Sequence, residues 1–483
     1  MYDVRLLIRD TAVPASDGRT FSRCNPITGQ VVTQAAAATV SDAGAAADAA
    51  AAAFPAWSGL GPGARRSKLL RAADLLEQRA TEAAARMAAE TGSTAAWAQL
   101  NVRLGAGMLR EAAALTTQIG GEVIPSDKPH LLAMSIRQPV GVVLGMAPWN
   151  APIILGVRAL ATPLACGNTV VFKASELCPA THRLIGEALC AAELPPGTVN
   201  VVTSAPEDAA AIVETLIAHR SVRRINFTGS TRVGRIVAQH AARHLKRVLL
   251  ELGGKAPLLV LDDADLEEAV KASAFGAFMN QGQICMSTER IVVSEQVADA
   301  FVARLAERAK TLRAGDPQSG PVVLGPLVCV EAAERVHQLI QDAVSKGAIL
   351  AAGGNRNGAV VEATVLDHVT PEMRIYSEES FGPLVTVLRV KDDEEAIRVA
   401  NDSEFGLSAS VFSRDIGRAL EIARRIESGI CHINGPTVQD EPQMPFGGVK
   451  SSGYGRFGGK AGIEEFTELR WITIATGPQH YPI

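Results

Sequence analysis

Four short apolar runs between Gly141 and Thr228 decide the fold of this chain: GVVLGMA (141–147), TVVFK (169–173), TVNVV (198–202) and RRINFT (223–228). They recur about 25 to 29 residues apart, and the residues between them have a helical pattern. Strands that alternate with helices at this spacing are typical of a parallel sheet. We therefore predict an α/β lobe built around these four strands.

The residues before these runs are predicted to be helical. Residues 41–79 are rich in alanine with interspersed Asp, Glu and Arg, and Pro55 is expected to divide them into successive helices. The helical pattern continues to about Ile119. We therefore expect several helices before the first strand of the sheet.

A second α/β region follows the first. The runs RVLLEL (247–252) and PLLVLDDAD (257–265) are separated by Gly253-Gly254, and a helix is predicted from Leu266 to about Phe278. Strand and helix patterns then alternate from Arg290 to Phe412. The sequence thus predicts two α/β lobes.

Two further segments have no obvious partner within either lobe. Residues 121–140 and 464–483 alternate polar and apolar side chains, as in LRWITIA. One hypothesis is a protruding β-ribbon used for subunit contact. The alternative is that both segments are edge strands of the main sheets.

The composition excludes several classes of protein. With 483 residues, 47% of them hydrophobic and 20% charged, the chain is expected to be globular with two or three domains. A net charge of −4 without a long basic block argues against nucleic acid as a partner. The most apolar stretch, 142–157, is too short to span a membrane, and the N-terminal residues MYDVRLLIRD lack a secretory signal. We therefore expect a cytoplasmic protein without a membrane or nucleic-acid partner.

The seven cysteines include no CxxC pair and no Cys and His cluster at zinc spacing, which favours a reduced compartment and argues against a metal site. Cys285 differs from the others because it lies in a polar, Gly-containing turn, NQGQICMSTER (280–290), directly ahead of a predicted strand. Such a thiol is a candidate nucleophile. Its alternative is the role of core filler.

Two other polar residues stand at the ends of apolar runs. Glu251 in LLELGGK precedes two glycines, in surroundings that could raise its pKa and make it a general base. Asn150 in APWNAP lies between prolines that restrict the backbone, so its amide is a candidate oxyanion donor. The alternatives are a buried ion-pair partner for Glu251 and a turn-forming residue for Asn150.

Two motifs could bind parts of a nucleotide. NFTGSTRVGR (226–235) places a turn bounded by Gly229 and Gly234 between a strand and a helix, where backbone N–H groups could bind a phosphate. Its GxxxxG spacing also fits an ordinary strand-to-helix turn. In FKASE (172–176), Lys173 and Glu176 could flank a ribose, with the carboxylate repelling a 2′-phosphate. A solvated charge pair is the alternative.

The motifs together resemble the aldehyde dehydrogenase superfamily. They stand in the order and spacing found there: PWN, FKASE, FTGSTRVG, LELGGK, GQICMS, EESFGP (378–383) and PFGGVKSSGYGR (445–456). The resemblance covers the chain from about Asn25 to the C-terminus. It implies an α/β fold with a Rossmann-like dinucleotide-binding domain (1–120 and 141–252), an α/β catalytic domain (253–463) and a protruding oligomerisation ribbon (121–140 and 464–483).

The resemblance also implies an activity, the oxidation of an aldehyde to a carboxylic acid with a nicotinamide cofactor. Cys285 would form a thiohemiacetal and then a thioester. Asn150 and the backbone N–H of Cys285 would hold the oxyanion, and Glu251 would activate water. Because a thiol of ordinary pKa is mostly protonated at pH 7, activation of Cys285 by a nearby base or dipole is expected.

For the cofactor, the resemblance implies binding by strand ends, helix starts and two residues of the EESFGP motif. The expected residues are Met146, Ala147, Pro148, Trp149, Lys173, Ser175, Glu176, Gly229, Ser230, Val233, Gly234, Leu252, Gly253, Glu379 and Phe381. Glu176 favours NAD, although Lys173 beside it could accept NADP.

The chain looks most like the salicylaldehyde, vanillin and benzaldehyde dehydrogenase branch, which implies an aromatic aldehyde. Residues expected to contact this substrate are Trp97, Asn101, Leu104, Ile154, Arg158, Met279, Ile284 and Met286. Arg158 could bind a phenolate or stack on a ring; its alternative is a salt bridge on the helix surface. Alternatives for the activity are an aliphatic or semialdehyde dehydrogenase and a non-redox cysteine esterase or acyl transferase. A homodimer or homotetramer is expected.

Overall fold

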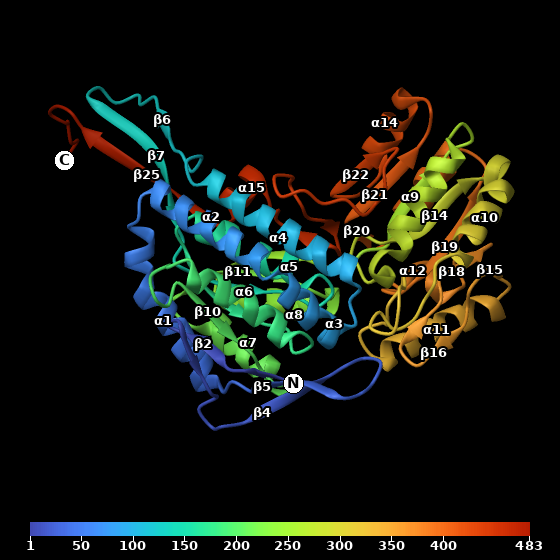
Figure 1. Cartoon of the computed structure of the whole chain (residues 1–483). Helices are drawn as coiled ribbons and strands as arrows, with labels where there is room; N and C mark the ends of the chain where they lie inside the picture. Colours follow the sequence, from blue (N-terminus) through green and yellow to red (C-terminus); the bar gives the residue numbers. More distant parts are fainter.

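The four apolar runs form the centre of an eight-stranded sheet in the computed structural model, which describes residues 1–483 (Figure 1). In spatial order its strands are β24 (Gly453–Tyr454), β12 (Arg247–Glu251), β11 (Val222–Thr228), β8 (Val142–Met146), β9 (Thr169–Lys173), β10 (Val199–Val202), β2 (Leu6–Ile8) and β3 (Thr11–Val13). The five strands from β12 to β10 run parallel, and the outer strands are antiparallel. The prediction of a parallel sheet is confirmed.

Helices cover both faces of this sheet. One face packs against α1 (Val40–Ser58), α7 (Ala209–Ala218) and α8 (Thr231–Arg243), the other against α5 (Pro152–Ala165) and α6 (Pro179–Ala191). Outside α5 and α6 lie α2 (Pro62–Gln78), α3 (Ala80–Thr91) and α4 (Ala95–Leu115). Side chains of β8 alternate between the two cores, with Leu144 on one face and Val143 on the other. Burial on both faces explains why these strands are apolar throughout.

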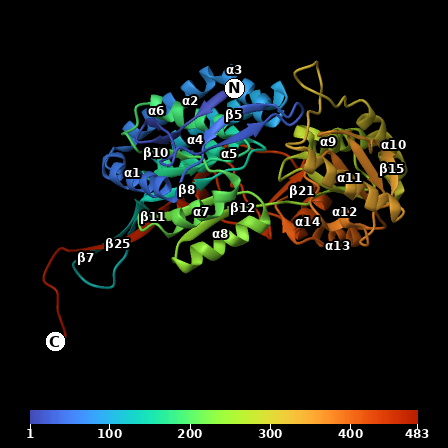
Figure 2. The same cartoon turned by 90° about the horizontal axis from the view of Figure 1, so that it is seen from below.

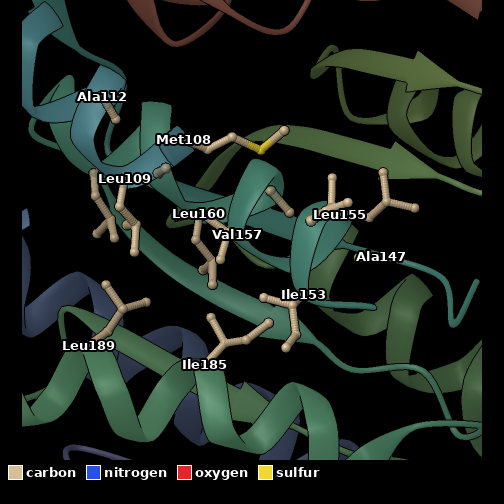
Figure 3. Close-up of a cluster of buried hydrophobic side chains, with 14 of the residues drawn as sticks. Met108, Leu109, Ala112, Ala147, Ile153, Leu155, Val157, Leu160, Ile185 and Leu189 are labelled. Carbon is tan, nitrogen blue, oxygen red and sulfur yellow. The ribbon is translucent and has the colours of Figure 1, made fainter. Parts of the chain in front are cut away.

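Helix α5 is the centre of the larger core. All of its residues are buried, and side chains from α4 and α6 surround it (Figure 3). A helix with apolar residues on nearly every side belongs in an interior. Since α5 begins two residues after Asn150, this packing fixes the chain at the end of β8.

Pro55 does not divide the helical segment where it was expected to. It lies inside α1, which continues to Ser58, and the chain instead breaks at Gly59–Gly61. Trp57, two residues after Pro55, is fully buried and donates a hydrogen bond from Nε1 to the Leu164 carbonyl at 3.1 Å. This packing holds the last turn of α1 despite the missing N–H of the proline.

A seven-stranded sheet forms the second lobe. Its spatial order is β15 (Ile349–Ala352), β18 (Thr364–Asp367), β19 (Leu384–Val390), β14 (Thr288–Ser294), β13 (Ala256–Val260), β21 (Ser408–Phe412) and β22 (Ile430–Ile433). One face packs against α9 (Leu266–Phe278) and α10 (Glu295–Lys310), and the other against α11 (Val330–Ser345), α13 (Asp393–Asn401) and α14 (Ile416–Arg425). Helix α9 has the predicted bounds, and Asp265 caps its N-terminus.

The expected range of the second lobe, 253–463, is too long at its end. Strand β24 joins the first sheet beside β12, and α15 (Gly459–Glu465) contacts α4 and α5. Phe446 and Phe457 belong to the core of the first lobe. The chain therefore returns to the first lobe after β22, and it does so along the boundary where the two lobes meet.

Residues of the two unassigned segments form a separate three-stranded sheet, here called the ribbon: β25 (Thr467–Ala475), β7 (Leu131–Pro139) and β6 (Glu122–Ile124). Strands β25 and β7 pair antiparallel from Thr467 opposite Pro139 to Ala475 opposite Leu131. The ribbon stands away from both lobes in two views (Figures 1 and 2). The expectation of a protruding ribbon is confirmed, and the alternative of edge strands in the main sheets is wrong.

A small N-terminal sheet completes the fold, with the order β1 (Tyr2–Val4), β5 (Val31–Ala36) and β4 (Thr20–Cys24). No helix combines the length and the apolar character needed to cross a bilayer. No group of three or more His, Cys, Asp or Glu side chains is arranged to hold a metal ion.

Candidate active site

Cys285 lies in a tight turn between α9 and β14. The preceding residues Asn280 and Gln281 have φ values of 48° and 55°, and Gly282 has a φ of 69°. A Cβ on Gly282 would lie 2.0 Å from the carbonyl oxygen of Gly382, so glycine is required there. The turn thus holds Cys285 between the lobes through backbone conformations that few residues adopt.

Asn150 is anchored beside this turn by three hydrogen bonds. Its Nδ2 donates to the carbonyl of Gln283 at 2.9 Å. Its own carbonyl accepts from Trp97 Nε1 at 2.9 Å and from Asn280 Nδ2 at 3.0 Å. One amide proton of Asn150 therefore remains for a ligand, and the backbone N–H of Cys285 also has no acceptor in the protein.

Glu251 ends β12 and is fully buried. Burial raises the pKa of its carboxyl group to about 7, against smaller opposing effects of Cys285, Arg158 and Thr228. Cys285 and Thr228 approach the carboxylate, but neither completes a hydrogen bond of standard geometry, and both oxygens lack a donor. An acid with these surroundings can take up and release a proton near neutral pH.

The Cys285 thiol is not activated by a lowered pKa. Burial, followed by the neighbouring Glu251 carboxylate, raises its pKa well above the ordinary value. Activation by a nearby base or dipole was expected, and a candidate base lies beside the thiol. Glu251 is placed to accept the thiol proton as the sulfur reacts.

Two cavities meet at Cys285 and Asn150. The first, of about 230 Å³, runs between the carboxyl ends of β8, β11 and β12 and the segment 379–381. We call it the cofactor-side cavity. It is lined by Pro148, Trp149, Asn150, Leu155, Thr228, Gly229, Ser230, Glu251, Leu252, Gly253, Cys285, Glu379 and Phe381.

The second cavity has a volume of about 310 Å³ and is mainly apolar. We call it the substrate-side cavity. Its walls come from α4, α5, the end of α9, the Cys285 turn and the segment 438–446. Asn150, Leu155 and Cys285 line both cavities. A thiol at the junction of two cavities can react with a small molecule from one side while a second molecule occupies the other.

Comparison with known proteins assigns the architecture. Residues 13–472 match the model of the aldehyde dehydrogenase family. The chain is 64% identical to a vanillin dehydrogenase of Pseudomonas fluorescens over the whole of both chains.

The chain belongs to the aldehyde dehydrogenase family.

Solved structures of two family members agree with this assignment. The crystal structure of a salicylaldehyde dehydrogenase from Pseudomonas putida G7, complexed with salicylaldehyde, superposes with a TM-score of 0.98 at 53% identity over the whole of both chains. A betaine aldehyde dehydrogenase from Staphylococcus aureus in complex with NAD⁺ superposes with a TM-score of 0.94 at 32% identity, over 99% of this chain and 95% of that one. A nicotinamide-dependent oxidoreductase is thereby established.

The two glycines of the FTGSTRVG motif do not offer the free N–H groups that were expected of this turn. Gly229 donates its N–H to the Glu251 carbonyl at 3.0 Å, and Gly234 donates to the Ser230 carbonyl at 2.9 Å. Gly234 lies inside α8, where a Cβ would approach Leu252 to 2.4 Å. The N–H groups free for a ligand are instead those of the first turn of α8, which Ser230 caps.

The residues expected around the ribose lie beside the cofactor-side cavity rather than in its wall. Lys173 at the end of β9 pairs with Met146 of β8 in the sheet, and its Nζ lies 3.4 Å from Glu176 Oε2. Ser175 accepts a hydrogen bond from the N–H of Leu177 at 3.2 Å. Ala147 is buried after β8, and Val233 lies in the first turn of α8. The charge pair is thus half-buried, with only Glu176 substantially open to solvent.

Glu379 and Phe381 are held by a buried ion pair that sequence reasoning missed. Lys255 Nζ lies 2.7 Å from Glu289 Oε2, and Glu289 accepts hydrogen bonds from the N–H groups of Ser380 and Phe381. Glu379 Oε1 accepts from the N–H of Gly254 at 2.9 Å, and burial raises the Glu379 pKa to about 7. The lysine of LELGGK and the glutamate of QICMSTER were the available signals.

Seven of the eight expected substrate residues line the substrate-side cavity: Trp97, Leu104, Ile154, Arg158, Met279, Ile284 and Met286. Asn101 does not. It is fully buried, donates from Nδ2 to the Trp97 carbonyl at 3.0 Å and accepts from the N–H of Ile154 at 3.4 Å. It ties α4 to α5, and Leu100 takes its place in the wall.

Arg158 is buried in the cavity wall rather than exposed on a helix surface. Its guanidinium forms an ion pair with Asp440 and lies over the ring of Phe446, with 4.1 Å to the ring centroid. Sequence reasoning did not identify Asp440, nor the other lining residues Arg103, Phe275, Val438, Gln439 and Phe446. Phe446 lies within the motif PFGGVKSSGYGR and residues 438–440 lie shortly before it, but none of them carried a local signal of a substrate contact.

Proposed function

We propose that this protein oxidises aromatic aldehydes to carboxylic acids with NAD, through covalent attachment of the substrate to Cys285. The observation that carries the proposal is the meeting of the two cavities at Cys285 and Asn150, with Glu251 beside the thiol in one of them. This arrangement brings a nucleophile, an oxyanion donor and a base to one small molecule.

In the first half of the reaction, the Cys285 sulfur bonds to the carbonyl carbon and its proton passes to Glu251. The carbonyl oxygen becomes an oxyanion, which accepts hydrogen bonds from the free amide proton of Asn150 and from the Cys285 N–H. A nicotinamide cofactor, when bound, supplies the acceptor for the hydride that this adduct loses. The acyl group is left on the sulfur as a thioester.

In the second half, Glu251 first releases its proton to solvent. It then takes a proton from a water molecule, whose oxygen bonds to the thioester carbon. The C–S bond breaks, the carboxylic acid leaves, and Glu251 returns its proton to the sulfur. A carboxyl group with a pKa of about 7 suits both transfers because neither protonation state is strongly favoured near neutral pH.

The residues in the wall of the cofactor-side cavity and beside it suit a dinucleotide. The capped N-terminus of α8 offers N–H groups to the phosphates, and Glu379 lies between the Gly253-Gly254 backbone and the cavity as an acceptor for ribose hydroxyls. Trp149 and Phe381, whose rings meet edge to face at 5.8 Å, supply aromatic surface to the same cavity. Glu176, open to solvent after β9, favours NAD because its carboxylate would repel a 2′-phosphate.

An aromatic substrate fits the apolar walls of the substrate-side cavity, in which Trp97, Phe275 and Phe446 supply ring surfaces. The names of similar proteins, vanillin dehydrogenase and salicylaldehyde dehydrogenase, support the same class. Arg158 could contact an oxygen substituent of the ring, and the wall as a whole gives an aliphatic chain fewer stacking contacts.

The ribbon supports a homodimer or homotetramer. Its strands expose Val123, Leu469 and Trp471, whose side chains are 61% to 75% exposed. The register of the strands places Leu469 and Trp471 on one face of the sheet and Val123 on the other. Exposed apolar side chains on a projecting sheet are typical of a subunit interface. Light scattering that reports a monomer at working concentration would contradict this part of the proposal.

The activity is tested by the absorbance of reduced nicotinamide with benzaldehyde and NAD. We expect the wild type to reduce NAD and Cys285→Ala to lose at least 10³-fold in rate, since no other group can form the thioester. Cys431→Ala, which removes another partly buried thiol, is the matched control and should keep its rate. A Cys285→Ala protein with full activity would overturn the assignment, and ester hydrolysis without nucleotide reduction would favour a non-redox hydrolase.

A further inference from the structure

The wall of the substrate-side cavity contains an ion pair among apolar side chains. Arg158 on α5 meets Asp440 in the loop between β22 and β23 (Val449–Lys450). The two side chains are 6% and 12% exposed. The rings of Phe446 and Phe457 lie 4.1 and 5.8 Å from the guanidinium carbon. Aromatic rings therefore cover much of the cation, and the carboxylate holds it at one nitrogen.

This pair has unused hydrogen-bonding capacity. Only Nη2 of Arg158 and Oδ2 of Asp440 take part in the contact. The other guanidinium nitrogens and Asp440 Oδ1 make no hydrogen bond in the protein, and none of these atoms is enclosed by it. A carboxylate oxygen with free lone pairs is an acceptor that cannot donate.

The pair lines two cavities of different volume. Arg158, Asp440 and Phe446 also line a second, small cavity of about 20 Å³ on their far side. That volume holds about one water molecule. The substrate-side cavity, of about 310 Å³, has more room for a ring and also contains Cys285, so it is the side from which a ring is expected to meet the pair.

The stability of the fold does not explain why two charged side chains occupy this position. A buried ion pair contributes little net stability because the cost of removing both charges from water offsets their attraction. Apolar side chains of similar volume would complete the cavity wall equally well. The pair therefore acts mainly on what enters the cavity, by offering polar atoms at a fixed place in an apolar wall.

We propose that Asp440 is a specificity-determining residue that accepts a hydrogen bond from a hydroxyl group on the ring of the aldehyde. Arg158 balances its charge and offers donors to a neighbouring oxygen of the same ring. The favoured substrates are hydroxylated aromatic aldehydes, and a methyl ether at the same ring position gains nothing from Asp440 because it cannot donate. This inference rests on the proposed oxidation of aromatic aldehydes.

The test compares substrates in pairs that differ only in the donor. The value of kcat/KM is measured at pH 7 for 3- and 4-hydroxybenzaldehyde and for their methyl ethers, with NAD, in the full-length protein. We expect the wild type to prefer the hydroxyl compound of at least one pair. For that pair Asp440→Asn should lower the hydroxyl-to-ether ratio about tenfold, because a hydrogen bond to a charged acceptor becomes one to a neutral amide.

Two further variants separate recognition from structural damage. Glu441→Gln removes the adjacent negative charge, which lines the small cavity but not the substrate-side cavity, and should leave the ratio unchanged. The double variant Arg158→Leu with Asp440→Leu leaves no unpaired charge, so it should fold and show the same loss of preference as Asp440→Asn. A ratio that stays at the wild-type value in either Asp440 variant, or falls equally in Glu441→Gln, would overturn the inference. Failure of the wild type to reduce NAD with unsubstituted benzaldehyde would overturn the proposed function itself and this inference with it.

Discussion

The two cavities that meet at Cys285 are built in different ways. The cofactor-side cavity is lined mainly by residues that directly follow the parallel strands β8, β11 and β12. The substrate-side cavity is lined by side chains of α4, α5 and α9 and by the segment 438–446, which come together only through packing. Strand ends place residues by the register of the sheet, whereas helix faces place them by contacts between distant segments. The residues that line the first cavity can therefore be predicted from sequence motifs, whereas few of those that line the second can.

The largest expected effect is on the reaction rate and comes from removing the base where the two cavities meet. Glu251→Gln should lower the steady-state rate of NAD reduction by about 10² to 10⁴, because an amide cannot accept a proton from the thiol or from water. Stopped-flow and steady-state measurements of reduced nicotinamide with benzaldehyde check this. Glu404→Gln, which changes an exposed carboxylate at the surface, serves as the control. A Glu251→Gln rate within threefold of the wild type would show that another group is the base.

A smaller effect concerns the free energy of unfolding, which the buried Glu251 carboxyl group makes dependent on pH. The pKa of Glu251 is about 7 in the folded protein and about 4.5 when exposed, so the folded state retains a proton that the unfolded state has lost between these values. The stability from this group is present below pH 4.5 and is lost as the pH rises through 7. We expect Glu251→Gln to weaken the loss of stability between pH 5 and pH 8 by about 2 to 3 kcal/mol.

Denaturant unfolding of both proteins at pH 5 and pH 8 measures this difference. Glu379 has a pKa raised to about 7 by burial and should contribute a loss of the same sign, so the wild type should lose more than Glu251 alone explains. Parallel pH profiles of the wild type and Glu251→Gln would contradict the raised pKa of Glu251.

The smallest expected effect is on the preference for NAD over NADP. Glu176→Gln should lower the ratio of kcat/KM for NAD over NADP by about tenfold, because the carboxylate that repels a 2′-phosphate is gone while Lys173 remains. Steady-state kinetics with both nucleotides and one aromatic aldehyde give the ratio. Glu214→Gln on α7, remote from the end of β9, is the matched control. An unchanged ratio in Glu176→Gln would remove Glu176 from cofactor discrimination.

The sequence predicted the regular parts of the fold well, because each part had a local signal. The strands at 142–146 and 169–173 are buried on both faces, so their apolar runs were unambiguous, and the helical pattern from Leu266 matches α9. Pro55 misled because its local effect on the backbone was outweighed by burial of Trp57 against α5. The return of β24 to the first sheet also lacked a signal, since two residues cannot show a strand period.

The candidate site divides in the same way. Glu251 ends β12, Asn150 lies between β8 and α5, and Cys285 lies in the turn before β14, and the structure brings the three to one cavity. Asn101 was assigned to the wrong face of α4. The face that lines the cavity includes its neighbour Leu100 instead. Asp440 could not be predicted as a substrate contact because its position depends on pairing with Arg158, which is 282 residues away in the chain.

By itself the sequence determined which segments become strands and helices, and which thiol, carboxyl and amide groups lie at their ends. Hydrophobic periodicity and turn residues act over a few residues, so they can be read without the fold. Only the tertiary structure decided how acidic Glu251 is, that Arg158 is paired, and that an apolar cavity opens beside Cys285. Those properties depend on desolvation and on contacts between side chains that only packing brings together.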